Sequence, residues 1–366
     1  MQLDFTADQD ELRTSVRSIL EGEWPIASVR ALVETGDTSA VNDLWKTMVS
    51  LDWPALAIAQ EHGGVGLGFV ELAVVAEELG RVVAAGPLLP TATQFVPAVR
   101  EVAGGASLGP VATGQQTGTL AVAEEGRWDL ASVATVARPA GAAFTLHGTK
   151  THVFEAAAVD TIAVVARLEG ADGLSLFAIA PADAQVRALT PVDGTRTLAS
   201  VVLDGTPAAP IGTPGAAAPG LARALEEATI ALALEMVGTS QTIFDLTLEY
   251  AKVRHQFGVP IGSFQAVKHK LANMMVALER ARATCYFAAA TVAEDDPRRG
   301  VAASMAKAAA GDAQRLVTQD GIQLLGGIGY TWEHDMHLYV KRAKCSEALF
   351  GSASYHRSRV ADHLGL

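Results

Sequence analysis

Hydrophobic positions recur at two different spacings along this chain, and the spacing changes twice. From Phe5 to about Gly105, apolar residues recur every three or four positions, the period of a helix that buries one face. From about Thr117 to Pro214 the chain instead holds short segments rich in β-branched residues and separated by Gly, Pro and Asp, which predict a compact β-domain. From Leu221 onward the helical period returns. The predicted order is therefore helices, a β-domain and a second helical region.

The first helical region contains two clear helix patterns. "TADQDELRTSVRSILEGE" begins with Thr6 as a predicted N-terminal cap and carries Leu12, Val16 and Leu20 at four-residue spacing. "ELAVVAEELGRVVA" predicts another helix, which Gly80 interrupts or ends. The Gly-rich stretch "EHGGVGLG" between them predicts a loop.

Six segments of the middle region are predicted strands: "TLAVAEE", "SVATVARP", "AFTLHGTKTHVF", "TIAVVARL", "LSLFAIA" and "LASVVLDG". The stretch "PIGTPGAAAPG", Pro210–Gly220, predicts a linker between the β-domain and the helices that follow.

The last region predicts four long helices. The first runs from Leu221 to Gly258, and the second follows "IGSFQAV" with Ser263 as its cap. The third ends on Gly326 and Gly327, and the fourth covers "HLYVKRAKCSEALFGSASYHRSRVADHL", where Gly351 is the weakest point of the pattern. Long helices in one domain usually bundle.

The fold class is therefore a multidomain α+β protein with an N-terminal helical domain, a central β-barrel or sandwich, and a C-terminal four-helix bundle. We place the domains at residues 1–116, 117–215 and 216–366.

Composition narrows the class of function. A net charge of −12 argues against a general nucleic-acid binder, because a phosphate backbone attracts a basic face. No apolar run reaches the roughly 20 residues of a membrane span, and the N-terminus lacks the pattern of a signal peptide. The two cysteines, Cys285 and Cys345, make no disulfide framework, and no Cys/His cluster has metal-ligand spacing. A cytoplasmic location is the expectation.

The stretch "AKVRHQFGVPIGSFQAV", Ala251–Val267, carries more chemistry than a helical corner needs. Arg254 and Phe257 are predicted to lie one helical turn apart just before a Gly-Val-Pro break, and Gln265 follows the break. Taken singly, Arg254 is explained as a charge at a helix C-terminus and Phe257 as a core residue. The three together instead favour a ligand at this corner.

Together with "QLLGGIGYTWEHDMHLYVKRAK" near the end, this corner resembles the acyl-CoA dehydrogenase family, and the resemblance extends over essentially the whole chain. It implies an FAD cofactor and an oligomer in which FAD lies mainly on a neighbouring subunit. Arg254 would then offer a guanidinium to the pyrophosphate, Phe257 would pack against flavin or adenine, and Gln265 would hydrogen-bond phosphate or ribose. The resemblance extends the FAD contacts to Gln323, Gly326 and Gly327, where backbone free of side chains permits close approach.

The base that the family uses to remove the substrate α-proton is missing. Where many members have "Tyr-Glu-Gly-Thr", this chain has "LFGS", so that Phe350 occupies the base position. Members with the base on the first bundle helix would place it near Ala228 and Thr229, and neither is a base. The adjacent Glu226 and Glu227 are predicted to face solvent or a neighbouring helix, because one residue turns a helical side chain by about 100°. Glu235, among apolar residues, is kept as a fallback base.

The β-domain departs from the family pattern as well. The family usually has a "Thr-Glu-Pro-x-x-Gly-Ser-Asp"-like loop and a "Trp-x-Thr" strand that hold the flavin ring. Here Glu124 and Gly126 echo that loop faintly, and His152 and Phe154 replace the Trp and the Thr. Gly148 and Lys150 remain, but a Gly-x-Lys turn carries little information.

Retained cofactor contacts and a missing base imply a non-catalytic subunit, resembling that of the actinobacterial α2β2 acyl-CoA dehydrogenases of sterol side-chain degradation. Its partner would be a homologous Glu-bearing subunit, and the substrate an acyl-CoA thioester, by analogy a steroid side-chain CoA. Two alternatives stay open: a self-sufficient homo-oligomeric flavoenzyme with a relocated base, and a scaffold or acyl-CoA-binding subunit without redox chemistry.

Overall fold

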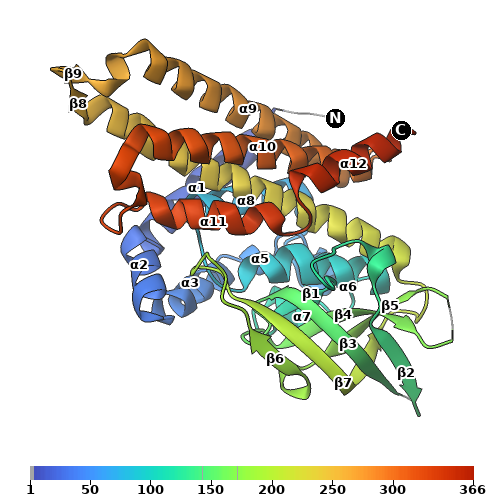
Figure 1. The fold of residues 1–366 in the computed structure, drawn as a ribbon. Helices are drawn as coiled ribbons and strands as arrows, with labels where there is room; N and C mark the ends of the chain where they lie inside the picture. Colours follow the sequence, from blue (N-terminus) through green and yellow to red (C-terminus); the bar gives the residue numbers. More distant parts are fainter. Residues whose placement is uncertain (1–3, 142, 171) are drawn as a thin grey trace. The chain divides into compact units, whose positions relative to one another are not determined.

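The computed structural model describes residues 4–141, 143–170 and 172–366, which group into two compact units (Figure 1). The helical unit comprises Met1–Asp37, Ala73–Ala84 and Thr229–Leu366, and the sheet unit comprises Thr38–Leu72 and Ala85–Ala228. These units group the chain by contact rather than by sequence order. The domain boundaries after residues 116 and 215 stay a prediction.

The helices of the described chain are α1 Ala7–Glu23, α2 Ile26–Thr35, α3 Ser39–Ser50, α4 Phe69–Arg81, α5 Leu88–Pro90, α6 Val96–Ala103, α7 Gly109–Ala112, α8 Ala218–Val253, α9 Gln265–Ala293, α10 Arg299–Leu325, α11 Met336–Ala348 and α12 Ala353–His363. None of them combines the length and the apolar character that a membrane crossing requires.

The N-terminal predictions hold. Thr6 caps α1 through a capping box in which its hydroxyl accepts from the backbone N–H of Gln9. Gly80 lies one residue before the end of α4, and its role is close packing. A Cβ atom there would lie 2.1 Å from the carbonyl oxygen of Glu235 on α8. On the opposing helix, a Cβ at Gly238 would lie 1.9 Å from the carbonyl oxygen of Glu77. The two glycines therefore let α4 and α8 approach backbone to backbone.

The strands are β1 Gly118–Ala121, β2 Val136–Ala140, β3 Ala143–Phe154, β4 Thr161–Leu168, β5 Leu174–Ile179, β6 Gln185–Ala188 and β7 Leu198–Ile211. They pair in the order β1-β4-β2-β3-β7-β5, with β6 on β7, and a further pairing of β4 with β5 closes the ring. The predicted central β-domain is thus a barrel with β1 and β6 added to it, and its interior is apolar, with Val164, Phe177 and Val201 fully buried.

Two predictions for the sheet unit were wrong. Strand β6 was missed, because "QVRA" is short and largely exposed and lacks the apolar alternation that marks a strand. The linker was placed too widely. Pro210 still pairs in β7, and α8 already begins at Ala218, since proline is tolerated in a first helical turn. Only residues 212–217 connect the two elements.

The long helices of the helical unit confirm the predicted bundle, with three corrections. Helix α8 ends at Val253 rather than Gly258, because a small hairpin follows, made of β8 His255–Gln256 and β9 Val259–Pro260. Ser263 does not cap α9, since its hydroxyl donates to the carbonyl of Pro260 at 2.7 Å. The fourth predicted helix is two helices, α11 and α12, separated by residues 349–352. Helix α10 ends at Leu325 with Gly326 as its C-cap, where the sequence predicted its end.

Candidate functional site

Phe257 stands at the tip of the β8–β9 hairpin rather than on the helix predicted for it. The backbone of Phe257 has φ 54° and that of Gly258 has φ 81°, so both central residues are left-handed, as in a type I′ turn. The Phe257 side chain is 93% exposed and meets Phe264 edge-on, with 6.2 Å between ring centroids. The hairpin therefore projects an aromatic ring away from the helical unit.

Arg254 is fixed by its main chain and free at its side chain. Its N–H donates to the carbonyl of Tyr250 at 2.9 Å, and its own carbonyl accepts from the N–H of Ile261 at 2.7 Å. The side chain is exposed, and its guanidinium has no ion-pair partner within residues 4–141, 143–170 and 172–366. Gln265, also exposed, is the first residue of α9.

The second predicted contact segment lies at the end of α10. Gln323, Gly326 and Gly327 are all exposed. Gly326 has φ 67° and ψ −142°, a conformation that favours glycine, and a Cβ on either glycine would meet nothing within 4 Å. In Figure 1 this segment and the β8–β9 hairpin lie toward the same end of the helical unit. All six predicted FAD contacts thus face outward.

The turn at Phe350 is held by two buried titratable side chains that the sequence did not single out. Phe350 is 4% exposed and left-handed, with φ 55°. Lys307 donates to the carbonyls of Ser346, Glu347 and Gly351 at 3.3, 3.2 and 2.9 Å. His356 Nε2 lies 2.8 Å from the carbonyl oxygen of Phe350. Burial lowers the pKa of Lys307 to about 7 and that of His356 to about 4. Lys307 sits within an alanine-rich helix, where it has the appearance of an ordinary surface lysine.

Two of the three glutamates of α8 considered as bases or near-bases, Glu227 and Glu235, are engaged by arginine. Glu235 and Arg342 are each 2% exposed and form an ion pair, and Arg342 also donates to the carbonyls of Val83 and Ala84. Glu227, equally buried, accepts from Arg100 Nη2 of α6 at 2.5 Å. Glu227 therefore faces a neighbouring helix, as the sequence allowed, and the bond to Arg342 favours a structural role for Glu235.

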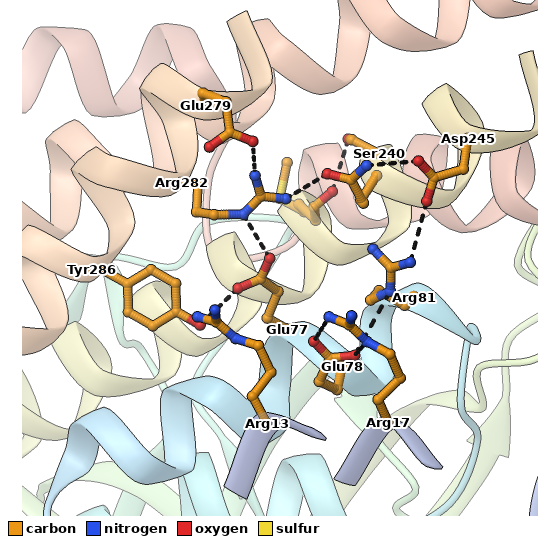
Figure 2. A network of polar contacts seen from close by, with 12 residues as sticks. Arg13, Arg17, Glu77, Glu78, Arg81, Ser240, Asp245, Glu279, Arg282 and Tyr286 are labelled. Carbon is orange, nitrogen blue, oxygen red and sulfur yellow. Dashed lines mark hydrogen bonds and ion pairs between the residues drawn. The ribbon is translucent and has the colours of Figure 1, made fainter. Parts of the chain in front are cut away.

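A polar network joins α1, α4, α8 and α9 of the helical unit (Figure 2). Glu77 of α4 accepts from Arg282 Nε at 2.8 Å and from the Tyr286 hydroxyl at 2.6 Å. The neighbouring Glu78 accepts two hydrogen bonds from Arg17 at 2.9 and 2.7 Å. Burial would lower the pKa of Arg282, but the Glu77 and Glu279 carboxylates together outweigh it and the pKa is raised. The network neutralises two carboxylates that α4 buries.

In the sheet unit, Glu124 and Lys150 form a buried pair that the sequence reasoning underrated. Lys150 Nζ donates to Glu124 Oε1 at 2.6 Å, and the Lys150 side chain is fully buried. Burial lowers the pKa of Lys150 to about 8, against the opposing effect of Glu124. Gly148 belongs to the same arrangement, because a Cβ there would lie 2.5 Å from the Thr135 hydroxyl.

The end of β3 holds the two residues that replace the family's Trp and Thr. His152 has φ 54°, packs against Trp128 with 6.4 Å between ring centroids, and has a pKa that burial lowers. Phe154 is 2% exposed, and the guanidinium of Arg196 lies 5.1 Å from its ring centroid. At both positions, a side chain of this chain thus packs against the residue: Trp128 against His152, and Arg196 against Phe154.

Comparison with known proteins identifies the family of this chain. The family model for the acyl-CoA dehydrogenase C-terminal domain matches residues 221–365, and that for the N-terminal domain matches residues 6–107. This chain belongs to the acyl-CoA dehydrogenase family. The acyl-CoA dehydrogenase IpdE2 of Mycolicibacterium smegmatis is 32% identical over 348 residues, which cover 95% of this chain and 96% of that protein.

Two solved structures share the fold over nearly the whole chain. A variant of the Tcur3481–Tcur3483 steroid ACAD is 30% identical with a TM-score of 0.87, covering 98% of each chain. The ChsE4–ChsE5 complex from Mycobacterium tuberculosis is 26% identical with a TM-score of 0.88, covering 100% of this chain and 99% of that one. The predicted family and fold class are confirmed.

FAD is the cofactor of this family. Residues of the helical unit fit such a group. Arg254 offers a guanidinium without a carboxylate partner among the described residues, and Gly326 and Gly327 leave open space where Cβ atoms would stand. A dinucleotide pyrophosphate can use both features. It accepts hydrogen bonds from a guanidinium fork, and it approaches backbone closely where no side chain intervenes.

Proposed function

We propose that this chain is a subunit of an FAD-dependent acyl-CoA dehydrogenase that completes an FAD site held mainly by a partner subunit. The exposed side chains at the β8–β9 hairpin carry this proposal. Arg254 has a fixed backbone and an unpaired guanidinium among the described residues, and Phe257 is 93% exposed at the tip. A residue needed only by its own subunit would be expected to contact that subunit. Gln265, Gln323, Gly326 and Gly327 would extend the same contact.

The reaction would be α,β-desaturation of an acyl-CoA thioester, in which a base removes the α-proton and bound FAD accepts the hydride. This chain offers no evident base. Phe350 holds the usual position, and every buried Asp or Glu in the described part of the chain is paired with Lys or Arg. The partner subunit would therefore supply the catalytic Glu.

The names of two related structures support a heteromeric partnership and a steroid-type substrate. One related structure is a complex of two differently named chains, ChsE4 and ChsE5, and another is a steroid ACAD whose name also joins two chains. We infer an α2β2 heterotetramer with a homologous Glu-bearing subunit, acting on a steroid side-chain CoA. A self-sufficient enzyme would have to free Glu235 from Arg342, and a mere scaffold would not need an unpaired Arg254.

Co-expression with the Glu-bearing partner tests the proposal. The complex should carry about one FAD per heterodimer, measured by absorbance after desalting, and the lone chain should carry little. Arg254→Ala should lower the FAD content of the complex at least several-fold, because a charge-assisted contact is lost. Arg280→Ala, an exposed arginine on α9, is the matched control and should leave FAD unchanged. Stoichiometric FAD and dehydrogenase activity in the lone chain would overturn the proposal, as would unchanged FAD in the Arg254 variant.

A further inference from the structure

A polar hollow lies beside the network of Figure 2, within the helical unit. It has a volume of about 460 Å³, and its walls come from α1, α4, α8 and α9. Four arginines line it, Arg13, Arg17, Arg81 and Arg282, together with three carboxylates. In Figure 2 the side chains of Arg13 and Arg17 rise from α1 toward the glutamates of α4. A hollow with four guanidinium groups favours an anionic ligand.

Two of these arginines keep hydrogen-bond donors that the described residues do not use. Arg17 donates from Nε and Nη2 to Glu78 at 2.9 and 2.7 Å, and its Nη1 has no partner among the described residues. Arg81 donates from Nη2 to Asp245 at 3.2 Å, whereas its Nε lies 3.7 Å from Glu78 Oε2, too far for a hydrogen bond. Arg282 already donates from all three of its nitrogens. The spare donors therefore belong to α1 and α4.

Arg13 is positioned by aromatic rings rather than by a buried carboxylate. Its guanidinium lies 4.0 Å from the ring centroid of Phe5 and 5.9 Å from that of Tyr286. Its ion-pair partner is Asp10 of the same helix, at 3.8 Å, and that carboxylate is 63% exposed. The rings attract the cation without neutralising its charge. Arg13 therefore presents a positioned but weakly paired cation at the hollow.

Two of the three carboxylates of the hollow are exposed enough to give way to a ligand. The side chains of Asp245 and Glu279 are 42% and 48% exposed, and they pair with Arg81 and Arg282. Exposed ion pairs of this kind contribute little to stability. If Arg81 turns to a ligand, Asp245 keeps a 2.8 Å hydrogen bond from Gln241 Nε2. A stronger acceptor can therefore take Arg81 from Asp245 at little cost.

We infer that this hollow binds the phosphate group of a small molecule through Arg13, Arg17 and Arg81. A terminal phosphate presents three oxygens, so guanidinium groups from two different helices can each bind one or two of them, whereas a planar carboxylate presents only two. The volume exceeds that of a phosphate group, so free phosphate and a nucleotide share the chemistry that the site recognises. The six predicted FAD contacts are not among the residues that line the hollow, so the site stands independently of the proposed function.

Isothermal titration calorimetry of the full chain at constant ionic strength tests the site, with inorganic phosphate, pyrophosphate and AMP as probes. We expect saturable binding of inorganic phosphate and a rise in Tm beyond that given by sodium chloride of equal ionic strength. Tighter binding of AMP than of inorganic phosphate would identify a nucleotide as the source of the phosphate group, and equal binding would identify free phosphate. If none of the three probes binds, the inference is overturned.

Substitutions within the hollow separate a specific site from a general effect of salt. Arg13→Gln and Arg81→Gln should each weaken phosphate binding at least about tenfold, because each removes a charged donor. Asp245→Asn should strengthen it several-fold, because it removes the carboxylate that competes for Arg81. Arg280→Gln is the matched control, since it removes the same charge from an exposed position of α9 outside the hollow and should bind as wild type does.

The Arg13 variant decides the outcome even if the Arg81 variant does not fold, because Arg13 pairs only with the exposed Asp10 and its loss leaves no buried carboxylate without a cation. Unchanged phosphate binding in Arg13→Gln overturns the inference. So does an equal loss in Arg280→Gln, which would show that net charge rather than the hollow attracts the anion. Weaker binding in Asp245→Asn would likewise contradict a ligand that takes Arg81 from this carboxylate.

Discussion

Neutralising Glu77 should reveal how strongly the network of Figure 2 stabilises the helical unit. Glu77→Gln keeps the shape of the side chain, and its amide oxygen can still accept from the Tyr286 hydroxyl. The amide nitrogen, however, is a donor, so the substitution removes a charged acceptor from Arg282. Glu77 is 4% exposed and the Arg282 side chain 19%, so solvent compensates little.

The expected loss follows from what Arg282 retains. Stranding a fully buried charge costs about 3–5 kcal/mol. Arg282 keeps an ion pair with Glu279 and a 2.6 Å hydrogen bond to Gln241 Oε1. We therefore expect Glu77→Gln to lower the free energy of unfolding by about 2–3 kcal/mol. Arg282→Met should cost at least as much, because it leaves the Glu77 carboxylate buried with only the Tyr286 hydroxyl.

Urea unfolding followed by far-UV circular dichroism measures each change, and the double variant measures the coupling. We expect the two losses to be less than additive by about 1–3 kcal/mol. Lys46→Met breaks an ion pair with Asp43 in which both side chains are largely exposed, and it should change stability by less than about 1 kcal/mol. A Glu77→Gln loss below about 0.5 kcal/mol, or strictly additive losses, would refute the reasoning.

Three further substitutions test packing and pH dependence. Gly238→Ala should destabilise the fold by about 3 kcal/mol or more in urea unfolding, because the new Cβ would lie 1.9 Å from a backbone oxygen of α4. Gly22→Ala, a helical glycine with nothing within 4 Å, should instead stabilise by about 0.5–1 kcal/mol, and equal effects at both sites would contradict the close-packing argument. Burial lowers the pKa of His356 from 6.5 to about 4, so the unfolded chain binds more protons between these values and stability should fall by up to about 3 kcal/mol from pH 6.5 to pH 4. In His356→Gln this fall should shrink by the same amount, and an unchanged pH profile would show that His356 is not its source.

The sequence predicted elements well wherever one periodic pattern decided them. Strands β3 and β4 begin and end where their β-branched runs do, and α1 starts at its predicted cap, Thr6. The pattern failed where a few backbone angles decide. The helix predicted to run to Gly258 stops at Val253, because two left-handed residues form a hairpin tip that hydrophobic period cannot register.

Partners distant in sequence were also beyond reach. Lys307 and His356 hold the turn at Phe350. Lys307 lies 43 residues before Phe350, and His356 lies 6 residues after it. Glu124 looked like a faint echo of a family loop, although it is the anchor of a buried four-donor cluster. Such roles depend on which segments become neighbours in the fold, and a single sequence does not show that.

Among the described residues, the buried carboxylates are paired with cations and exposed Arg254 is not, and this difference bears on function. The buried carboxylates Glu77, Glu78, Glu124, Glu227 and Glu235 each meet a lysine or arginine of this chain. A general base needs a carboxylate that is free to take a proton, so these ion pairs agree with the proposal that another subunit supplies the base. Exposed Arg254, on a backbone held at both its N–H and its carbonyl, has no such partner among the described residues. An unpaired, well-positioned cation at the surface together with fully paired anions inside favours a chain that contributes binding to a neighbour's cofactor and leaves the proton transfer to that neighbour.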